Sequence, residues 1–238
     1  MDGYSYIVFD IDDTLLDFGA AYAAARKDMA ALLGIRDDAD FEKLDEKCGW
    51  KAWAESRLDD TGDPEVQAHY HEYYMQYVHM HFAYLREALA LECDPDKLAA
   101  CYLDSVSASI VPMEADTLEV YRALSGRYRL VLASNGLTKM QTQRTVPFAA
   151  YTYRTYISEA VGAIKPTAAF FEYVLRDLGC RPEECLMVGD SLSNDMRGAK
   201  AAGMDVCWYN PRKKAMPEDV EIDFVIGSLR ELTEILPQ

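Results

Sequence analysis

The sequence predicts an α/β protein in which a parallel sheet carries helices on both faces, with an all-helical segment inserted after the first strand. From about residue 112 onwards, short apolar runs alternate with stretches of helical periodicity, and this alternation is typical of a parallel sheet covered on both faces. The run YSYIV at 4–8 is strand-like, and residues 17 to about 107, which follow it, contain almost nothing strand-like. The helical segment therefore interrupts the α/β core.

The inserted segment is expected to form several helices. Gly34 suits a helix C-terminus, and Asp94-Pro95 suits the start of a helix, because aspartate caps the first amide groups and proline fits the first turn. DDTGDPE at 59–65 breaks the periodic pattern. The predicted helices cover 20–34, 41–58, about Val66 to Leu91, and a stretch that opens at Asp94-Pro95.

The second half of the chain supplies the remaining strands and helices of the core. Strands are expected at 129–134, 153–158, 185–190, 204–209 and 222–226, and helices at 138–146, 167–178, 193–202 and the end of the chain. The predicted architecture is Rossmann-like. Its core comprises residues 1–15 and 110–238, and residues 16–109 form an inserted helical domain.

Composition and charge exclude several classes of partner. The formal net charge of −16 over 238 residues would repel a nucleic-acid polymer or an anionic membrane. No apolar run approaches the roughly 18 residues that span a bilayer, and no cleavable leader is expected at the N-terminus. The six scattered cysteines contain no CxxC pair, which favours reduced thiols in a cytoplasmic protein. We expect a monomer or a homodimer.

Polar residues gather at the predicted ends of three strands. In an open parallel sheet the carboxyl ends of the strands form the ligand-binding edge, so these residues should meet there. Carboxylates from separate strands would repel one another without a cation, and an oxygen-only set of ligands suits Mg²⁺. The candidates are Asp10, Asp12 and Thr14; Ser134 and Asn135; Asp190 and Asp195; and Lys165 at the approach to a helix.

The residue types at this edge suit phosphoryl chemistry. Asp10 and Asp12 lie two apart where a strand becomes a loop, so one can serve as nucleophile and the other as proton carrier. Thr14 and Ser134 offer hydroxyl groups to phosphoryl oxygens, and Lys165 offers a positive charge. Each residue also has a simpler interpretation. Lys165 alone would be a surface lysine, and Asp195 alone would complement a helix dipole.

The four motifs FDIDDT, SNG, the lysine of KP and GDSLSND, in this order, resemble those of the haloacid dehalogenase-like phosphohydrolase superfamily. The resemblance covers essentially the whole chain, because the insertion corresponds to that family's helical cap. It implies that Asp10 is a nucleophile that forms an aspartyl-phosphate. Asp12 would protonate the leaving oxygen and then activate water. Because the dehalogenases lack a carboxylate at the position of Asp12, the resemblance favours a phosphatase.

The same resemblance implies a role for each remaining motif residue. Thr14, Ser134 and Asn135 would bind the phosphoryl group, and Lys165 would neutralise charge on it and on Asp10. Mg²⁺ would be held by Asp10, the backbone carbonyl of Asp12 and Asp190, with Asp195 either a ligand or a residue behind the ligands.

Within the superfamily, the second half of the chain is most similar to bacterial pyrimidine 5'-nucleotidases. The similar stretches are SNGLTKMQTQR at 134–144, ISEAVGAIKP at 157–166 and LMVGDSLSNDMRGAKAAGMDVCWYNP at 186–211. The implied substrate is a small phosphomonoester, a nucleoside 5'-monophosphate. The alternatives are a sugar-phosphate or phosphoglycolate phosphatase, a phosphomutase, and a non-catalytic regulator that senses phosphate. An intact pair of Asp10 and Asp12 argues against the regulator.

Aromatic residues of the insertion are candidates for contact with the leaving group. Phe18, Trp50 and Trp53 come from separate segments, and Tyr77 belongs to a stripe of aromatic residues at helical spacing. Such a stripe either stacks on a nucleotide base or packs inside the domain, and packing is the commoner arrangement.

Overall fold

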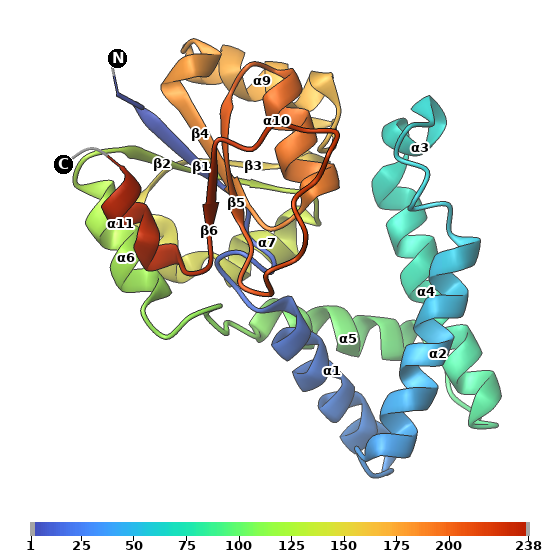
Figure 1. Cartoon of the computed structure of the whole chain (residues 1–238). Helices are drawn as coiled ribbons and strands as arrows, with labels where there is room; N and C mark the ends of the chain where they lie inside the picture. Colours follow the sequence, from blue (N-terminus) through green and yellow to red (C-terminus); the bar gives the residue numbers. More distant parts are fainter. Residues whose placement is uncertain (1–2, 237–238) are drawn as a thin grey trace. The chain divides into compact units, whose positions relative to one another are not determined.

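A computed structural model describes residues 3–236 of the chain (Figure 1). The chain divides into two compact units. The core unit comprises the residues up to Phe18 and from Ile110 onwards, and the helical unit comprises Gly19–Ser109.

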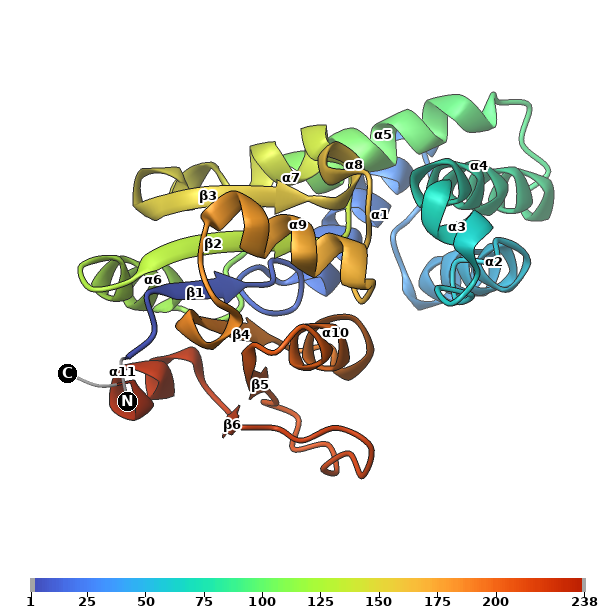
Figure 2. The ribbon, with the colours of Figure 1, turned by 90° about the horizontal axis from the view of Figure 1, so that it is seen from above.

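The core unit is built on a six-stranded parallel sheet with the strand order β3-β2-β1-β4-β5-β6 (Figure 2). The central pair, β1 and β4, is in register from Tyr6 opposite Cys185 to Phe9 opposite Val188. The strands are β1 (Tyr6–Phe9), β2 (Arg129–Ser134), β3 (Thr152–Ile157), β4 (Cys185–Gly189), β5 (Asp205–Tyr209) and β6 (Phe224–Ile226). The predicted α/β fold with a parallel sheet is confirmed.

Helices cover both faces of this sheet, as Figures 1 and 2 show. Side chains alternate between the faces along β1: Ile7 and Phe9 join one buried cluster, and Tyr6 and Val8 join the other. The first cluster receives residues from α6 (Thr117–Ser125), η1 (Val146–Tyr151), η4 (Leu229–Glu231) and α11 (Leu232–Ile235). The second receives residues from α9 (Ala168–Leu178), η3 (Leu192–Met196) and α10 (Arg197–Ala201). Because both faces are covered, the central strands β1 and β4 are apolar and buried along their whole length.

Three short elements complete the connections of the core unit. They are α7 (Thr138–Arg144), α8 (Ser158–Val161) and η2 (Pro182–Glu184).

The two segments that link the units pair with each other in a short antiparallel ladder inside the core unit. Leu16 makes an antiparallel bridge with Pro112. The Asp17 N–H donates to the carbonyl of Val111 at 2.9 Å, and the Met113 N–H donates to the carbonyl of Leu15 at 2.9 Å. The chain therefore leaves the core and returns to it along paired segments.

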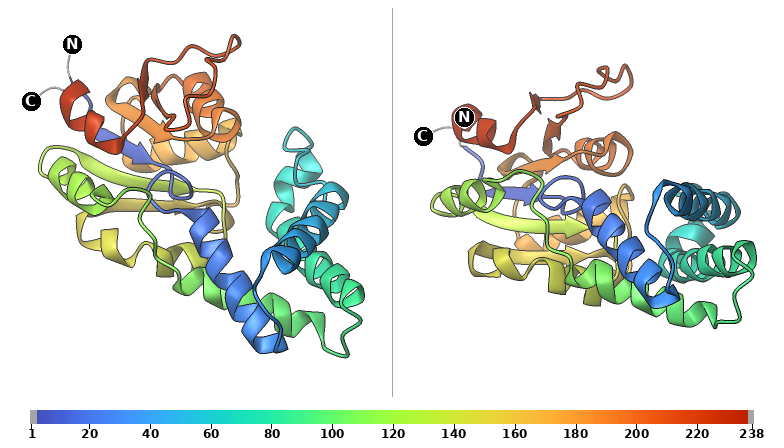
Figure 3. Two further views of the ribbon diagram at one scale, coloured as in Figure 1. Left: turned by 60° about the horizontal axis from the view of Figure 1, so that its bottom comes forward. Right: turned by 90° about the horizontal axis from the view of Figure 1, so that it is seen from below.

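The helical unit contains five helices among the described residues (Figures 1 and 3). They are α1 (Phe18–Leu33, whose first residue belongs to the core unit), α2 (Ala39–Glu55), α3 (Pro64–Ala68), α4 (Tyr70–Ala88) and α5 (Pro95–Ala108). Gly34 follows α1 with a left-handed φ of 68°, and the Asp94 side chain caps α5 by accepting from the Asp96 N–H. The sequence predicted both of these helix ends.

The single helix predicted from Val66 to Leu91 is instead two helices. His69 separates them with a φ of −118° and a ψ of 20°. α3 is tied to the preceding loop by the Gln67 side chain, which donates to the carbonyl of Thr61 at 2.7 Å. Helical periodicity continues through His69, so the pattern gave no sign of this break.

A buried polar network links three helices of this unit. The Asp45 carboxylate, which is fully buried, accepts from the Tyr22 hydroxyl at 2.6 Å and lies 2.9 Å from Nε2 of buried His81. Buried polar groups are stable only when they are paired in this way. The network therefore fixes how α1, α2 and α4 pack together. Within the described part of the chain, no helix has the length and apolarity needed to cross a membrane.

Glu114 fastens the C-terminal segment to the sheet. Its carboxylate accepts from the Tyr209 hydroxyl at 2.8 Å, the Ser228 hydroxyl at 2.6 Å and the Leu229 N–H at 3.0 Å. We expect Glu114→Ala to lower the free energy of unfolding by about 1–3 kcal/mol, because three partners lose their acceptor in a partly buried place. Denaturant unfolding followed by circular dichroism measures this loss.

Asp116→Ala is the matched control. Its carboxylate also reaches the C-terminal segment, through an ion pair with Arg230, but exposed pairs contribute only about 0–1 kcal/mol. Equal losses in the Glu114 and Asp116 variants would contradict the special role of Glu114.

Candidate active site

The candidate site begins where β1 ends. The Asp10 N–H donates to the carbonyl of Val188 at 2.9 Å, so the chain stays aligned with β4 as it leaves the sheet. The loop then turns sharply at Asp13, whose φ of 58° lies in the left-handed region. Aspartate tolerates this conformation better than most residues. The Asp13 carboxylate accepts from the Phe18 N–H at 3.2 Å, which steadies the turn.

Lys165 lies buried among oxygen atoms at this edge of the sheet. Its Nζ donates to Asp10 Oδ1 at 2.6 Å, to Asp195 Oδ1 at 2.6 Å and to the carbonyl of Ala133 at 2.9 Å. Burial alone would lower the pKa of Lys165, but the two carboxylates outweigh burial and raise its pKa above the ordinary value. The lysine is therefore a charged member of the site and not a surface residue.

Asn135 holds the backbone of Lys165 from both sides. Its side-chain oxygen accepts from the Lys165 N–H at 2.8 Å, and its amide nitrogen donates to the Lys165 carbonyl at 2.8 Å. The neighbouring Ser134 hydroxyl accepts from Gln141 Nε2 at 3.0 Å. The sequence placed Ser134 and Asn135 at this edge, and the structure brings them there. Their binding of a phosphoryl group stays a prediction.

Three carboxylates converge beside Lys165. Asp10, Asp190 and Asp195 each offer an oxygen within 4.8 Å of the others. Asp195 fits there because Gly189 has no side chain: a Cβ at that position would lie 2.3 Å from Asp195 Oδ2. Asp195 Oδ2 also accepts from the Ser191 N–H at 3.2 Å.

The electrostatics of this cluster favour a further cation. Burial raises the pKa of Asp190 to about 7, and the charges of Asp195 and Asp13 act in the same direction. Burial also raises the pKa of Asp10 well above its ordinary value, although Lys165 opposes this. Lys165 hydrogen-bonds to two of the three carboxylates, Asp10 and Asp195, and a set of carboxylate oxygens suits a hard divalent ion.

Thr14 connects the loops after β1 and β4. Its hydroxyl is fully buried and accepts from the Asp190 N–H at 3.1 Å. The Asp190 carbonyl accepts from the Trp208 indole at 3.0 Å. Thr14 thus helps to position Asp190. Contact of Thr14 with a phosphoryl group stays a prediction.

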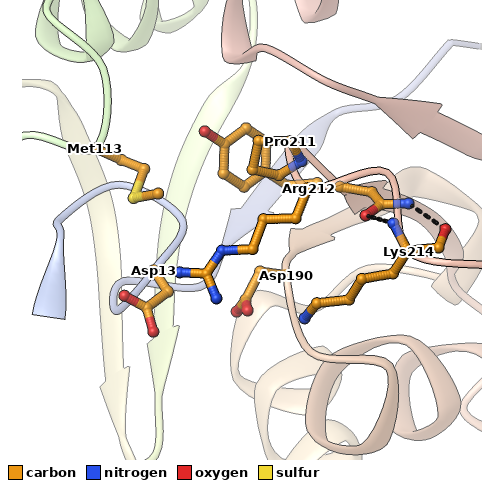
Figure 4. Close-up of a pocket in the computed structure, with 8 residues that line it drawn as sticks. Asp13, Met113, Asp190, Pro211, Arg212 and Lys214 are labelled. Atoms are coloured by element: carbon orange, nitrogen blue, oxygen red, sulfur yellow. Dashed lines mark hydrogen bonds between the residues drawn. The ribbon is translucent and has the colours of Figure 1, made fainter. Parts of the chain in front are cut away.

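A pocket beside Asp190 is lined by two positively charged side chains, Arg212 and Lys214, that sequence reasoning missed (Figure 4). Burial raises the pKa values of Asp13 and Asp190. The positive charge of Arg212 opposes this rise at Asp13, and that of Lys214 opposes it at Asp190. Asn210 shapes their loop, because its side chain makes two 2.9 Å hydrogen bonds with the backbone of Lys214. The lining residues are Asp13, Met113, Asp190, Tyr209, Asn210, Pro211, Arg212 and Lys214.

The Asp12 carboxylate is not a member of the three-carboxylate cluster, and sequence reasoning also missed its partners. Gln141 Nε2 donates to Asp12 Oδ2 at 2.5 Å, and Arg144 Nη1 donates to Asp12 Oδ1. Gln141 and Arg144 belong to SNGLTKMQTQR, one of the stretches that resemble the pyrimidine 5'-nucleotidases. Their spacing of three in a predicted helix was the available signal, since it places them on one face.

The aromatic candidates have different surroundings. Phe18 stacks near the Arg144 guanidinium, with 5.5 Å between the guanidinium carbon and the ring centre. Trp53 and Tyr77 pack edge to face, 5.4 Å apart. Trp50 is 71% exposed. Packing inside the helical unit thus accounts for the contact between Trp53 and Tyr77. Contact of any of the four with a leaving group stays a prediction.

Comparison with known proteins agrees with this geometry. The model of the haloacid dehalogenase-like hydrolase family matches residues 4–203. The pyrimidine 5'-nucleotidase PynA of Streptococcus pneumoniae is 27% identical over 236 residues, which cover 98% of this chain and 95% of PynA. A glyceraldehyde 3-phosphate phosphatase of Methanothermobacter thermautotrophicus is 30% identical over 240 residues, covering 97% of this chain and 98% of that protein.

A solved structure shows the same fold. The magnesium-bound YfnB protein of Bacillus subtilis superposes with a TM-score of 0.84 at 24% identity, over the full length of both chains. The fold and the family match together define a class of hydrolytic enzyme. The chain belongs to the haloacid dehalogenase-like hydrolases. The family and the enzyme class predicted from the sequence are confirmed.

Proposed function

We propose that the chain is a Mg²⁺-dependent phosphomonoester hydrolase that acts through an aspartyl-phosphate on Asp10. The observation that carries the proposal is the buried Lys165 ammonium, which lies 2.6 Å from both Asp10 and Asp195 at the carboxyl ends of the central strands. In this proposal residues 1–15 and 110–238 are the catalytic core, and residues 16–109 are a cap that selects the leaving group.

The donor set fits Mg²⁺, because three carboxylates converge and offer oxygen ligands. Asp10, Asp190 and the backbone carbonyl of Asp12 would hold the ion, with Asp195 beside them. When bound, the ion supplies positive charge that offsets the carboxylates and the phosphoryl oxygens.

The residues then divide the reaction between them. An Asp10 carboxylate oxygen attacks phosphorus and displaces the leaving oxygen, which takes a proton from Asp12 as the P–O bond breaks. The resulting carboxylate of Asp12 accepts a proton from a water molecule. That water attacks the phosphoryl group on Asp10, so phosphate leaves and Asp10 is restored. Lys165 offsets the negative charge on Asp10 and on the phosphoryl oxygens in both steps.

A nucleoside 5'-monophosphate is the substrate class we favour. Similarity to a pyrimidine 5'-nucleotidase over nearly the whole chain supports it. A sugar-phosphate or phosphoglycolate phosphatase is the second candidate, and the 30% identity to a glyceraldehyde 3-phosphate phosphatase supports that direction. A phosphomutase would use the same aspartyl-phosphate but would return the phosphate to a sugar. A phosphate-sensing regulator would bind without turnover.

The test is phosphate release from a panel of monoesters with Mg²⁺ present and after chelation. UMP and dTMP represent the nucleotides. Glyceraldehyde 3-phosphate, a hexose phosphate and phosphoglycolate represent the alternatives. We expect UMP and dTMP to give the highest kcat/KM and chelation to abolish release. Cleavage of a sugar phosphate but not of UMP or dTMP would exclude the nucleotide assignment, and no release from any monoester would exclude the hydrolase.

A further inference from the structure

Gln141 and Arg144 are two large polar side chains that the fold buries completely. They lie three residues apart on α7, so they project from the same face of the helix. Glutamine and arginine are rarely buried in full unless a partner requires them. Their neighbours on α7, Thr142 and Gln143, are exposed. The helix therefore directs these two polar groups inward, towards the end of the sheet.

Both side chains hold the same carboxylate. Gln141 Nε2 reaches Asp12 Oδ2 at 2.5 Å, while Arg144 Nη1 donates to Asp12 Oδ1. Arg144 Nη1 also lies 3.3 Å from Gln141 Oε1, which links the two donors to each other. An ionised carboxylate only accepts hydrogen bonds. With one donor on each oxygen, the plane of the Asp12 carboxylate is fixed.

The surroundings are shaped to admit this arrangement. Gln141 Nε2 also lies 3.0 Å from Ser134 Oγ, so one amide joins the strand end to Asp12. A Cβ at Gly136 would lie 3.1 Å from Gln141 Cγ and Nε2. Glycine after Ser134 and Asn135 thus leaves the space that the glutamine amide occupies.

We propose that Gln141 and Arg144 are positioning residues that orient Asp12 for proton exchange with the leaving group and with water. The inference rests on the proposed function, in which Asp12 is the proton carrier. The side chain of Asp12 is 24% exposed whereas that of Arg144 is fully buried. The two donors therefore grip the carboxylate from the protein side and leave it open on the other.

Leaving-group dependence separates positioning from a merely structural role. An alkyl leaving group needs a proton from Asp12, whereas p-nitrophenolate leaves without one. We expect Arg144→Met and Gln141→Leu to lower kcat/KM for sn-glycerol 3-phosphate by about 10- to 100-fold. The loss for p-nitrophenyl phosphate should be about tenfold smaller. Asp12→Asn should show the same preference for the aryl ester.

A double-mutant cycle provides the second readout. If Arg144 and Gln141 act through Asp12, then Asp12→Asn combined with either variant should lose no more than about twofold beyond Asp12→Asn alone. Gln143→Leu is the matched control for Gln141→Leu, because it makes the same change on an exposed position of α7. It should match the wild type with both esters.

The outcomes distinguish the inference from the proposed function. Equal losses for the two esters, or losses that add to that of Asp12→Asn, would overturn the inference while the hydrolase stands. No phosphate release by the wild type from these two esters or from any monoester of the panel would overturn both. If Arg144→Met does not fold, Gln141→Leu decides the question alone, because it retains the buried arginine.

Discussion

Asp10→Asn should lower phosphate release from the best monoester by about 10⁴-fold or more. Asparagine has the size of aspartate, but its amide is a poor nucleophile. It also carries no negative charge to pair with Lys165, whose Nζ lies 2.6 Å from Asp10 Oδ1 in the wild type. Steady-state assays with Mg²⁺ present, followed by single-turnover measurements, would show whether the loss lies in the chemical step.

Asp13→Asn is the matched control for this change. Asp13 lies in the same loop and accepts a hydrogen bond from the Phe18 N–H, which an amide oxygen can also accept. We expect this variant to retain activity within about tenfold. Turnover by Asp10→Asn equal to that of the wild type would remove Asp10 as the nucleophile.

Lys165→Met should lower the free energy of unfolding by about 3–5 kcal/mol, because Asp10 and Asp195 would then face each other without the buried cation between them. Burial raises the pKa of Asp10, so protonation relieves this repulsion as the pH falls. The destabilisation should therefore be largest at neutral pH and above, and smaller in acid. Urea unfolding of wild type and variant across pH measures both effects.

Lys200→Met provides a comparison with a less buried ion pair. Lys200 contacts Asp223 at 2.7 Å, with about a quarter of its side chain exposed. Its loss should cost about 1 kcal/mol. A loss as large as that of Lys165→Met would mean that burial of the lysine is not what makes it important.

The sequence predicted the sheet and the strand ends because their signals are local. Each strand is a short apolar run, and each of Asp10, Ser134 and Asp190 directly follows or ends such a run. In a parallel sheet these ends meet at one edge, so the approach of Asp10, Ser134 and Asp190 follows from their places at the strand ends.

Other features depend on contacts between residues far apart in the chain, and the local sequence does not identify the partner. Gln141 and Arg144 belong to a polar stretch that is typical of a solvated helix, and their hydrogen bonds to Asp12, more than a hundred residues earlier, help to explain their burial. Arg212 and Lys214 face Asp13 and Asp190 because of a loop whose shape depends on a buried asparagine amide.

The ladder between residues 15–17 and 111–113 makes the helical unit an insertion whose two ends are held together by the core unit. Both junctions lie on one short pair of hydrogen-bonded segments. The chain therefore leaves the core unit and re-enters it at neighbouring points. Different helical segments can be spliced onto these ends while the loop that carries Asp10 and Asp12 keeps its own bonds. The inserted helices can then diversify without changes to the catalytic residues of the core unit.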